Sequence, residues 1–331
     1  MIALFKQKSP ANLIVLLIFG LLIKMPLFLY PKTITAGAAD GPLYHLFLSL
    51  FTAPGKDNAL SSSVVAFFLL YVQALLINYL VNEHRMTSKQ TFLSAMAYLL
   101  ISSLLPEWNY LSAPLVSATI VFWCFIKLFR LYNAPLASGI VFNIGLLLGI
   151  SSFIYFPSIA FLICLFVGVM ILRPFRVNEL IILFLGILSP YYFYAVYLFL
   201  TDKLAWAKIL PLLQIQIPPV QNNIWIAAAI VFLGVPFLVG GYFIQTQLRK
   251  MLIQVRKNWS ILLLYVLISL IIPFVNAGSS VQNWVILVAP FAAFHACAYL
   301  YPKKAAVSTL LFFLTTAFIL FQQYGTALWK N

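Results

Sequence analysis

The sequence predicts an all-α protein, a polytopic bundle of about eleven transmembrane helices that forms a single integral membrane domain over residues 1–331. Apolar segments of about 20 residues, the length at which a helix crosses about 30 Å of hydrocarbon, follow one another along the chain. Only 8% of the residues are charged, whereas an average soluble domain has about 25%. The ten-residue alternation of membrane β-strands is absent. Lipid is therefore the expected solvent for most of the chain.

Eleven segments have the apolar character expected of a span. The first follows Lys6 and Lys8, and no small-x-small cleavage site follows it, so we expect an uncleaved helix and not a signal peptide. The expected spans cover residues 11–30, 61–81, 91–105, 114–129, 136–154, 157–172, 180–200, 224–243, 260–275, 284–300 and 306–321.

The basic residues predict the orientation, because lysine and arginine collect in the cytoplasmic loops of membrane proteins. With a cytoplasmic N-terminus, fourteen of the twenty bases fall in inner segments, five in outer segments and one, Lys24, within the first span. An odd number of spans puts the C-terminus in the periplasm. The expected location is the bacterial cytoplasmic (inner) membrane. The bases are scattered in ones and twos, so no nucleic-acid partner is expected.

The two longest connections both lie on the outer side, at about residues 31–60 and 201–223. The first contains GPLYHLFLSLF, from Gly41 to Phe51, which is apolar but too short to span. We expect it to form a helix in the membrane interface. Together the two loops are expected to cover the outer face.

Asp40 is the first candidate catalytic acid, because it immediately precedes the interfacial segment and His45 lies about one helical turn beyond it. A carboxylate at a membrane surface can act as a general base or bind a divalent cation. The alternative is that Asp40 is the N-cap of the helix that begins near Gly41.

Glu107, in the outer loop PEWNYLS, is the second candidate catalytic acid. Trp108 and Tyr110 beside it provide a stacking surface for a sugar ring, or are aromatic residues of the interfacial belt. Lys203 and Lys208 either contact a lipid phosphate specifically or meet headgroups without specificity.

Four further residues or motifs have both a functional and a structural interpretation. Lys24 is a site candidate because ionisable groups within spans are usually functional, unless its side chain snorkels outward. GLLLG, from Gly145 to Gly149, predicts close helix contact. Glu83 and Glu179 are interpreted as partners in solvated ion pairs with the nearby arginines, Arg85 and Arg176.

No metal site or cofactor is predicted from the sequence. Cys124, Cys164 and Cys297 all lie in apolar segments and are interpreted as packing residues. His84 and His295 lack a second histidine or a cysteine pair at ligand spacing. No phosphate-binding glycine loop or nucleophile motif is present.

The layout of the first 210 residues resembles the C superfamily of membrane glycosyltransferases, which use polyprenyl-phosphate sugars. Asp40 with the segment Gly41 to Phe51, Glu107 in PEWN and the segment Asp202 to Lys208 carry the resemblance. It implies Asp40 as a base, Glu107 as an auxiliary acid or cation ligand, and Lys203 and Lys208 as phosphate contacts. The chain departs from the family because Asp40 stands alone and no arginine occurs in an outer loop.

The stretch from Phe142 to Tyr197 resembles an uncharacterised family of multi-span inner-membrane proteins of Bacteroidetes. Together the two resemblances imply a protein of the cell envelope that is glycosyltransferase-like, either active or degenerate, and that binds a polyprenyl-phosphate-linked substrate at its periplasmic face. His45 and Trp108 join the two lysines as expected substrate contacts. The alternatives are a noncatalytic subunit or scaffold of an envelope complex, with other envelope proteins as partners, and, third, a transporter.

Overall fold

The computed structural model describes residues 2–34, 40–50, 59–205, 224–275 and 281–325. The described residues are almost entirely helical, and six helices are long and apolar enough to cross a membrane. They are α5 (Ala59–Glu83), α10 (Val177–Leu200), α12 (Ile224–Gln247) with its 3-10 extension to Lys250, α13 (Ile253–Ile271) with its extension to Phe274, α14 (Val288–Leu300) with the preceding η5 (Val281–Leu287), and α15 (Ala305–Leu320) with η6 (Phe321–Gly325). The predicted helical membrane architecture is confirmed at this level.

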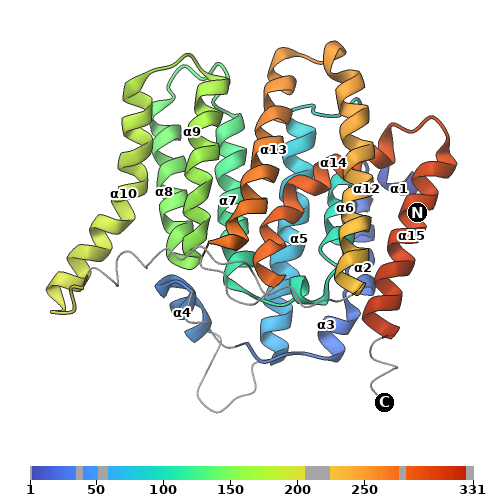
Figure 1. Cartoon of the computed structure of the whole chain (residues 1–331), viewed down its shortest axis with the longest axis horizontal. Coiled ribbons are helices and arrows are strands. Elements are labelled where there is room, and N and C mark those ends of the chain that lie inside the picture. Colours follow the sequence, from blue (N-terminus) through green and yellow to red (C-terminus); the bar gives the residue numbers. More distant parts are fainter. Residues whose placement is uncertain (1, 35–39, 51–58, 206–223, 276–280, 326–331) are drawn as a thin grey trace.

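Shorter elements complete the described bundle (Figure 1). Four apolar helical segments of 10–17 residues occur at 11–23, 113–129, 138–154 and 156–172. These correspond to α2 (Ala11–Ile23), α7 (Ala113–Phe129), α8 (Ser138–Ile154), and η2 (Phe156–Ala160) with α9 (Phe161–Leu172). The remaining short elements are α1 (Ile2–Phe5), α3 (Met25–Leu29), α4 (Pro42–Ser49), α6 (Leu93–Ile101) and η1 (Pro106–Asn109).

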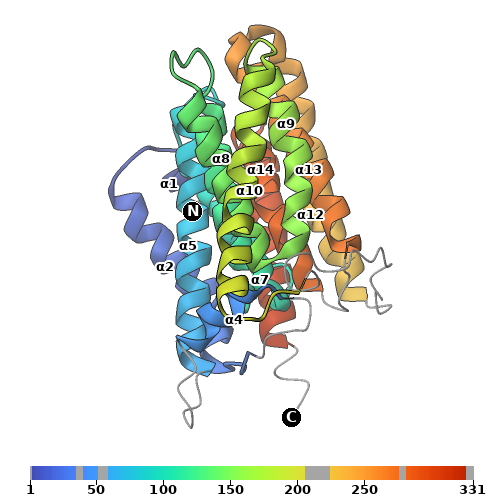
Figure 2. The ribbon, with the colours of Figure 1, turned by 90° about the vertical axis from the view of Figure 1, so that its left-hand side faces the viewer.

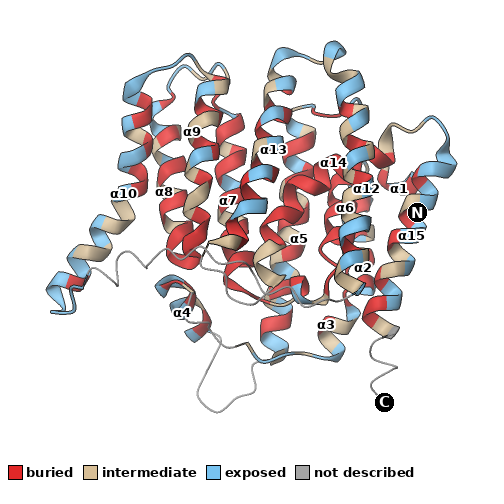
Figure 3. Cartoon of the chain, viewed as in Figure 1, coloured by how far each residue is buried: buried red, intermediate tan, exposed pale blue. Residues whose placement is uncertain are grey.

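The core contains two short helices, α6 and α14, which contact each other. All nine residues of α6 are buried, and in α14 Leu300 alone is not. They lie inside the bundle because other helices pack around them: α5, α12, α13 and α15 around α14, and α2 and α5 around α6. Figure 3 shows these central helices in red, with exposed residues concentrated on α10, α12 and α15.

Helices α8 and α10 approach each other at backbone distance. A Cβ atom added at Gly145 would lie 2.3 Å from the Leu183 carbonyl oxygen, and one at Gly186 would lie 2.4 Å from that of Phe142. A Cβ atom added at Gly149 would lie 2.7 Å from the Ile187 carbonyl oxygen, which is also on α10. The close contact predicted from GLLLG is therefore confirmed, and its partner is α10.

Beyond this contact, α10 bends away from the bundle in its second half (Figure 1). Pro190 lies inside the helix at this level. A proline removes an i to i−4 hydrogen bond and clashes with the preceding turn, which kinks a helix. The bend leaves Tyr192, Phe193 and Tyr197 strongly exposed.

Polar residues fasten neighbouring helices inside the bundle. The Gln73 amide of α5 donates to the Leu115 carbonyl (2.9 Å) and to Thr119 Oγ1 (2.6 Å) of α7, and it accepts from the Tyr98 hydroxyl of α6. Hydrocarbon cannot satisfy buried polar groups, so such hydrogen bonds fix which helix faces meet.

The predicted solvated ion pairs are wrong in both cases. Glu179 is buried and pairs with Arg173, not Arg176: Arg173 Nε lies 3.1 Å from both carboxylate oxygens. Arg173 also donates to the Ala134 carbonyl at 2.6 Å, which holds the α7–α8 connection. Glu83 is exposed and makes no ion pair with Arg85. Glu179 thus pairs with the arginine six residues before it and not with the one three residues before it, because the α9–α10 connection folds back.

The three cysteines are confirmed as packing residues, because Cys124, Cys164 and Cys297 are all buried and free.

We expect Gly145→Ala to destabilise the protein by about 1–3 kcal/mol, because the added methyl group must push α8 away from the α10 backbone. Thermal unfolding in detergent or nanodiscs measures the effect. Gly234→Ala is the matched control, since a Cβ atom there meets nothing within 4 Å and alanine is the better helix former. Equal melting temperatures for the two variants would contradict the proposed backbone contact.

Candidate functional site

Asp40 is held against the C-terminal end of α8 by its backbone. Asp40 and Tyr155 form an antiparallel bridge, and the Gly41 N–H donates to the Ile154 carbonyl at 3.0 Å. A Cβ atom at Gly41 would lie 2.0 Å from the Phe153 carbonyl oxygen, so the close approach requires glycine. The segment before α4 is thereby fixed to a spanning helix.

The predicted helix in the first outer loop is confirmed as α4, eight residues long. Figures 1 and 2 place it at the lower end of the bundle, where it does not run alongside the long helices. Its N-cap is Gly41, with Pro42 in the first turn, so Asp40 precedes the cap. The alternative interpretation of Asp40 as the N-cap residue is wrong, because the glycine required by the close approach occupies that position.

Two buried phenols flank Asp40. Tyr44 of α4 is 1% exposed and Tyr155 is 3% exposed, and the hydroxyl oxygen of each has no hydrogen-bond partner among the described residues. Burial, and then the negative charge of Asp40, raise the pKa of both hydroxyl groups. Both phenols therefore remain neutral donors near the carboxylate. We call Asp40, Tyr44 and Tyr155 the Asp40 site.

An aromatic surface on α10 adjoins this site. The Phe153 ring lies 4.5 Å from the Tyr191 ring and 5.1 Å from the Tyr194 ring. The Tyr191 and Ser152 hydroxyls are hydrogen-bonded at 2.7 Å. The backbone of Phe153 lies against Gly41, which places this aromatic surface next to the segment that carries Asp40. Aromatic rings next to a carboxylate suit a ligand with sugar hydroxyls and an apolar chain.

Glu107 lies in η1, whose neighbouring residues are firmly anchored. Trp108 is buried and its indole N–H donates to the Val281 carbonyl at 2.9 Å. Lys32 Nζ lies 4.5 Å from the centre of the Tyr110 ring. Burial, and then the charge of Glu107, raise the pKa of the Tyr110 hydroxyl. Glu107 itself is exposed. The Trp108 ring thus packs at this end of the bundle, with little of its surface open to a ligand.

Lys24 is fully buried at the junction of α2 and α3, so the interpretation that it snorkels outward is wrong. Its Nζ atom donates to Ser102 Oγ at 2.9 Å and to Asn109 Oδ1 at 2.5 Å. In the described part of the chain no carboxylate lies within ion-pair distance of it. The side chain turns inward because these two neutral acceptors, on α6 and η1, are reached inside the bundle. Lys24 therefore links the α2–α3 junction to η1, the short helix that contains Glu107.

The other predicted site residues lie apart or outside the described chain. His45 and Lys203 are exposed, and Lys208 lies outside the described residues. Helix α4 packs on α8, whereas η1 packs on η5 and α5. The structure thus brings Asp40 together with Tyr44 and Tyr155, and Glu107 together with Tyr110; a shared cavity for both acids stays a prediction.

A metal-binding cluster of three or more histidine, cysteine, aspartate or glutamate side chains does not occur within the described ranges. His295 is buried, with its Nε2 atom 2.8 Å from the Leu233 carbonyl oxygen, which is a packing role.

Sequence reasoning missed Tyr44, Tyr155, Ser102 and Asn109. Tyr44 lies in the segment already singled out, and its place four residues after Asp40 was an available signal. The bridge that brings Tyr155 to Asp40 joins residues more than one hundred positions apart in the chain. No motif spacing reports such a contact.

Comparison of the chain with models of protein families, with curated proteins and with solved structures found no match.

Lys24→Met is expected to lower the free energy of unfolding by about 1–3 kcal/mol, because it leaves the buried Asn109 oxygen without a donor. Lys32→Met is the matched control: that lysine is exposed and makes a cation–π contact with Tyr110. Thermal unfolding of both variants in the same detergent provides the measurement. If Lys24→Met has the same melting temperature as the parent protein, these hydrogen bonds do not stabilise the η1 loop.

Proposed function

We propose that this integral membrane protein belongs to the bacterial inner membrane and binds a polyprenyl-phosphate-linked sugar at its periplasmic face, in envelope glycan assembly. The observation that carries the proposal is the Asp40 site. A carboxylate is fixed by backbone pairing between two buried phenols whose hydroxyls have no hydrogen-bond partner among the described residues. The Tyr191 and Tyr194 rings of α10 lie beside the Phe153 ring, and the backbone of Phe153 lies against Gly41.

The chemistry proposed for this site is glycosyl transfer. An acceptor hydroxyl attacks the anomeric carbon of the sugar, and Asp40 takes the proton of that hydroxyl as general base. The bond from the anomeric carbon to the phosphate oxygen breaks, and the polyprenyl phosphate leaves with the electron pair. Tyr44 and Tyr155 can donate hydrogen bonds to substrate oxygens, because burial and the nearby charge keep their hydroxyls protonated.

The remaining predicted residues have supporting roles in this proposal. Glu107 is an auxiliary acid or cation ligand, Lys203 and Lys208 contact the phosphate, and His45 contacts the substrate, whereas the buried Trp108 ring supports the η1 loop. The prenyl chain would lie along the exposed aromatic residues of α10, where Tyr192 and Phe193 are more than half exposed. A lipid-linked substrate needs this combination, because its reacting end is polar and its carrier is apolar.

The proposed topology has eleven spans, with the N-terminus in the cytoplasm and the C-terminus in the periplasm. It is supported by the two ends of the bundle: the α9–α10 and α12–α13 connections lie together at the top of Figure 1, and α3, α4 and the end of α15 lie at the bottom. The connection after α12 carries Arg249 and Lys250. The positive-inside rule puts that end in the cytoplasm.

A second candidate is a noncatalytic scaffold of an envelope complex. The outward bend of α10 favours it, because that half of the helix presents Tyr192, Phe193, Phe199 and Leu200 away from the bundle. Such a face can contact a neighbouring membrane protein as well as lipid.

Single cysteines test the topology. Leu204→Cys is expected to react with a membrane-impermeant maleimide on spheroplasts, and Leu252→Cys only after permeabilisation. Both leucines are exposed, at 53% and 70%, and lie near opposite ends of the bundle. The parent protein is the control, because its three cysteines are buried. Labelling of Leu252→Cys on sealed spheroplasts would refute the proposed orientation.

Asp40→Asn is expected to abolish sugar transfer from polyprenyl-phosphate donors without unfolding the protein, because it removes the basic group and nearly preserves the shape. Tyr44→Phe should weaken donor binding but not lower stability, since the hydroxyl it removes has no partner among the described residues. Transfer assays in membranes and thermal unfolding are the two measurements.

Glu83→Gln, at the opposite end of the bundle, is the matched control for loss of a carboxylate and should leave transfer unchanged. Full transfer by Asp40→Asn would leave the scaffold as the better account.

A further inference from the structure

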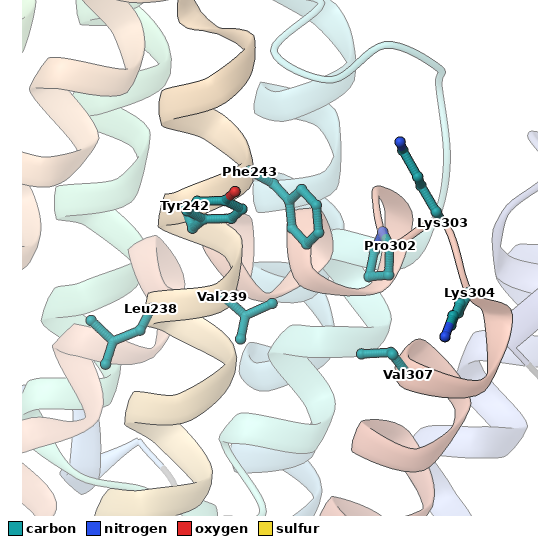
Figure 4. A pocket seen from close by; sticks show the side chains of 8 residues that line it. All are labelled: Leu238, Val239, Tyr242, Phe243, Pro302, Lys303, Lys304 and Val307. Carbon is teal, nitrogen blue, oxygen red and sulfur yellow. The ribbon is translucent and has the colours of Figure 1, made fainter.

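A groove on the flank of the bundle lies between α12 and the start of α15, away from the Asp40 site (Figure 4). Its volume is about 600 Å³, within the range of small-molecule sites. Its lining residues are Leu238, Val239, Tyr242, Phe243, Pro302, Lys303, Lys304 and Val307. The walls are thus almost wholly apolar, and the charged groups are the two consecutive lysines.

The groove exists because α12 and α15 touch at one end and diverge at the other. At the outer end Phe232 stacks on Phe318 at 4.7 Å, and Trp225 lies 5.6 Å from Phe321. Towards the inner end α12 packs instead on α14, where a Cβ atom at Gly240 would lie 2.0 Å from the Phe294 carbonyl oxygen. Helix α12 is therefore held inward while α15 begins at a distance from it.

Lys303 and Lys304 lie on the connection between α14 and α15, at the mouth of this groove. Both are exposed, and neither side chain makes a hydrogen bond or ion pair with a described residue. No carboxylate is among the lining residues. Figure 4 shows Val239 and Val307 on opposite walls, with the lysines on the α15 side.

We propose that the groove binds an anionic phospholipid of the bilayer, with an acyl chain between Val239 and Val307 and the phosphate at Lys303 and Lys304. Charge complementarity identifies the occupant. Two unpaired ammonium groups beside an apolar groove match a phosphate that is joined to a hydrocarbon chain, and basic sites between membrane helices bind anionic headgroups. A zwitterionic lipid carries its own cation and gains less from the lysines.

The test is native mass spectrometry of the protein from mixed micelles that hold equal amounts of phosphatidylglycerol and phosphatidylcholine. The parent protein should retain phosphatidylglycerol preferentially. Lys303→Gln/Lys304→Gln should lower its retention about thirtyfold, the order expected for losing two basic contacts to an anionic lipid. Arg249→Gln/Arg256→Gln, which removes two exposed positive charges near the same end of the bundle, is the matched control and should retain the lipid.

A third variant separates a groove from a merely basic surface. Val239→Trp keeps both lysines and fills the apolar wall, so it should lose phosphatidylglycerol as the lysine variant does. Equal retention of both lipids by the parent protein, equal losses in the lysine and arginine variants, or unchanged binding in Val239→Trp would each overturn the proposal. Size-exclusion profiles of all variants confirm that losses do not arise from unfolding.

Discussion

The backbone contact between α8 and α10 is the constraint on which the end of the bundle that carries α4 depends. Apolar side chains gain nothing by leaving lipid for a helix interface, so membrane helices associate through close packing and a few hydrogen bonds. Gly145, Gly149 and Gly186 remove the side chains that would keep the two backbones apart. The α8 helix then has a fixed position from which its outer end can hold other segments.

Hydrogen bonds fix the second side of α8. Ser151 Oγ lies 2.8 Å from Ser117 Oγ of α7 and donates to Ser158 Oγ of η2 at 3.1 Å. Four residues after Ser151, the backbone of Tyr155 pairs with Asp40. The packing of α8 against its neighbours therefore fixes the position of the Asp40 backbone. This is the supporting arrangement that a precisely held functional group requires.

Lys24 has a similar relation to the loop that carries Glu107. Its Nζ atom joins the α2–α3 junction to Ser102, just after α6, and to η1, and the Trp108 indole joins η1 to the segment at Val281. Both bonds lie beneath the surface on which Glu107 is exposed. Asp40 and Glu107 thus each lie on a short segment that is held by contacts with distant parts of the chain.

The sequence by itself determined the helical membrane architecture, because the solvent imposes it: long apolar segments with few charges can satisfy their backbone groups in lipid only as helices. It also determined the GLLLG contact, the packing role of the cysteines and the short helix after Gly41, which follow from local residue size and spacing. Tertiary structure decided the rest. The pairing of Glu179 with Arg173 depends on how the short α9–α10 connection folds. The inward direction of Lys24 and the meeting of Tyr155 with Asp40 depend on which helices become neighbours. That choice results from complementary shapes and hydrogen bonds between residues far apart in the chain, which no local pattern encodes.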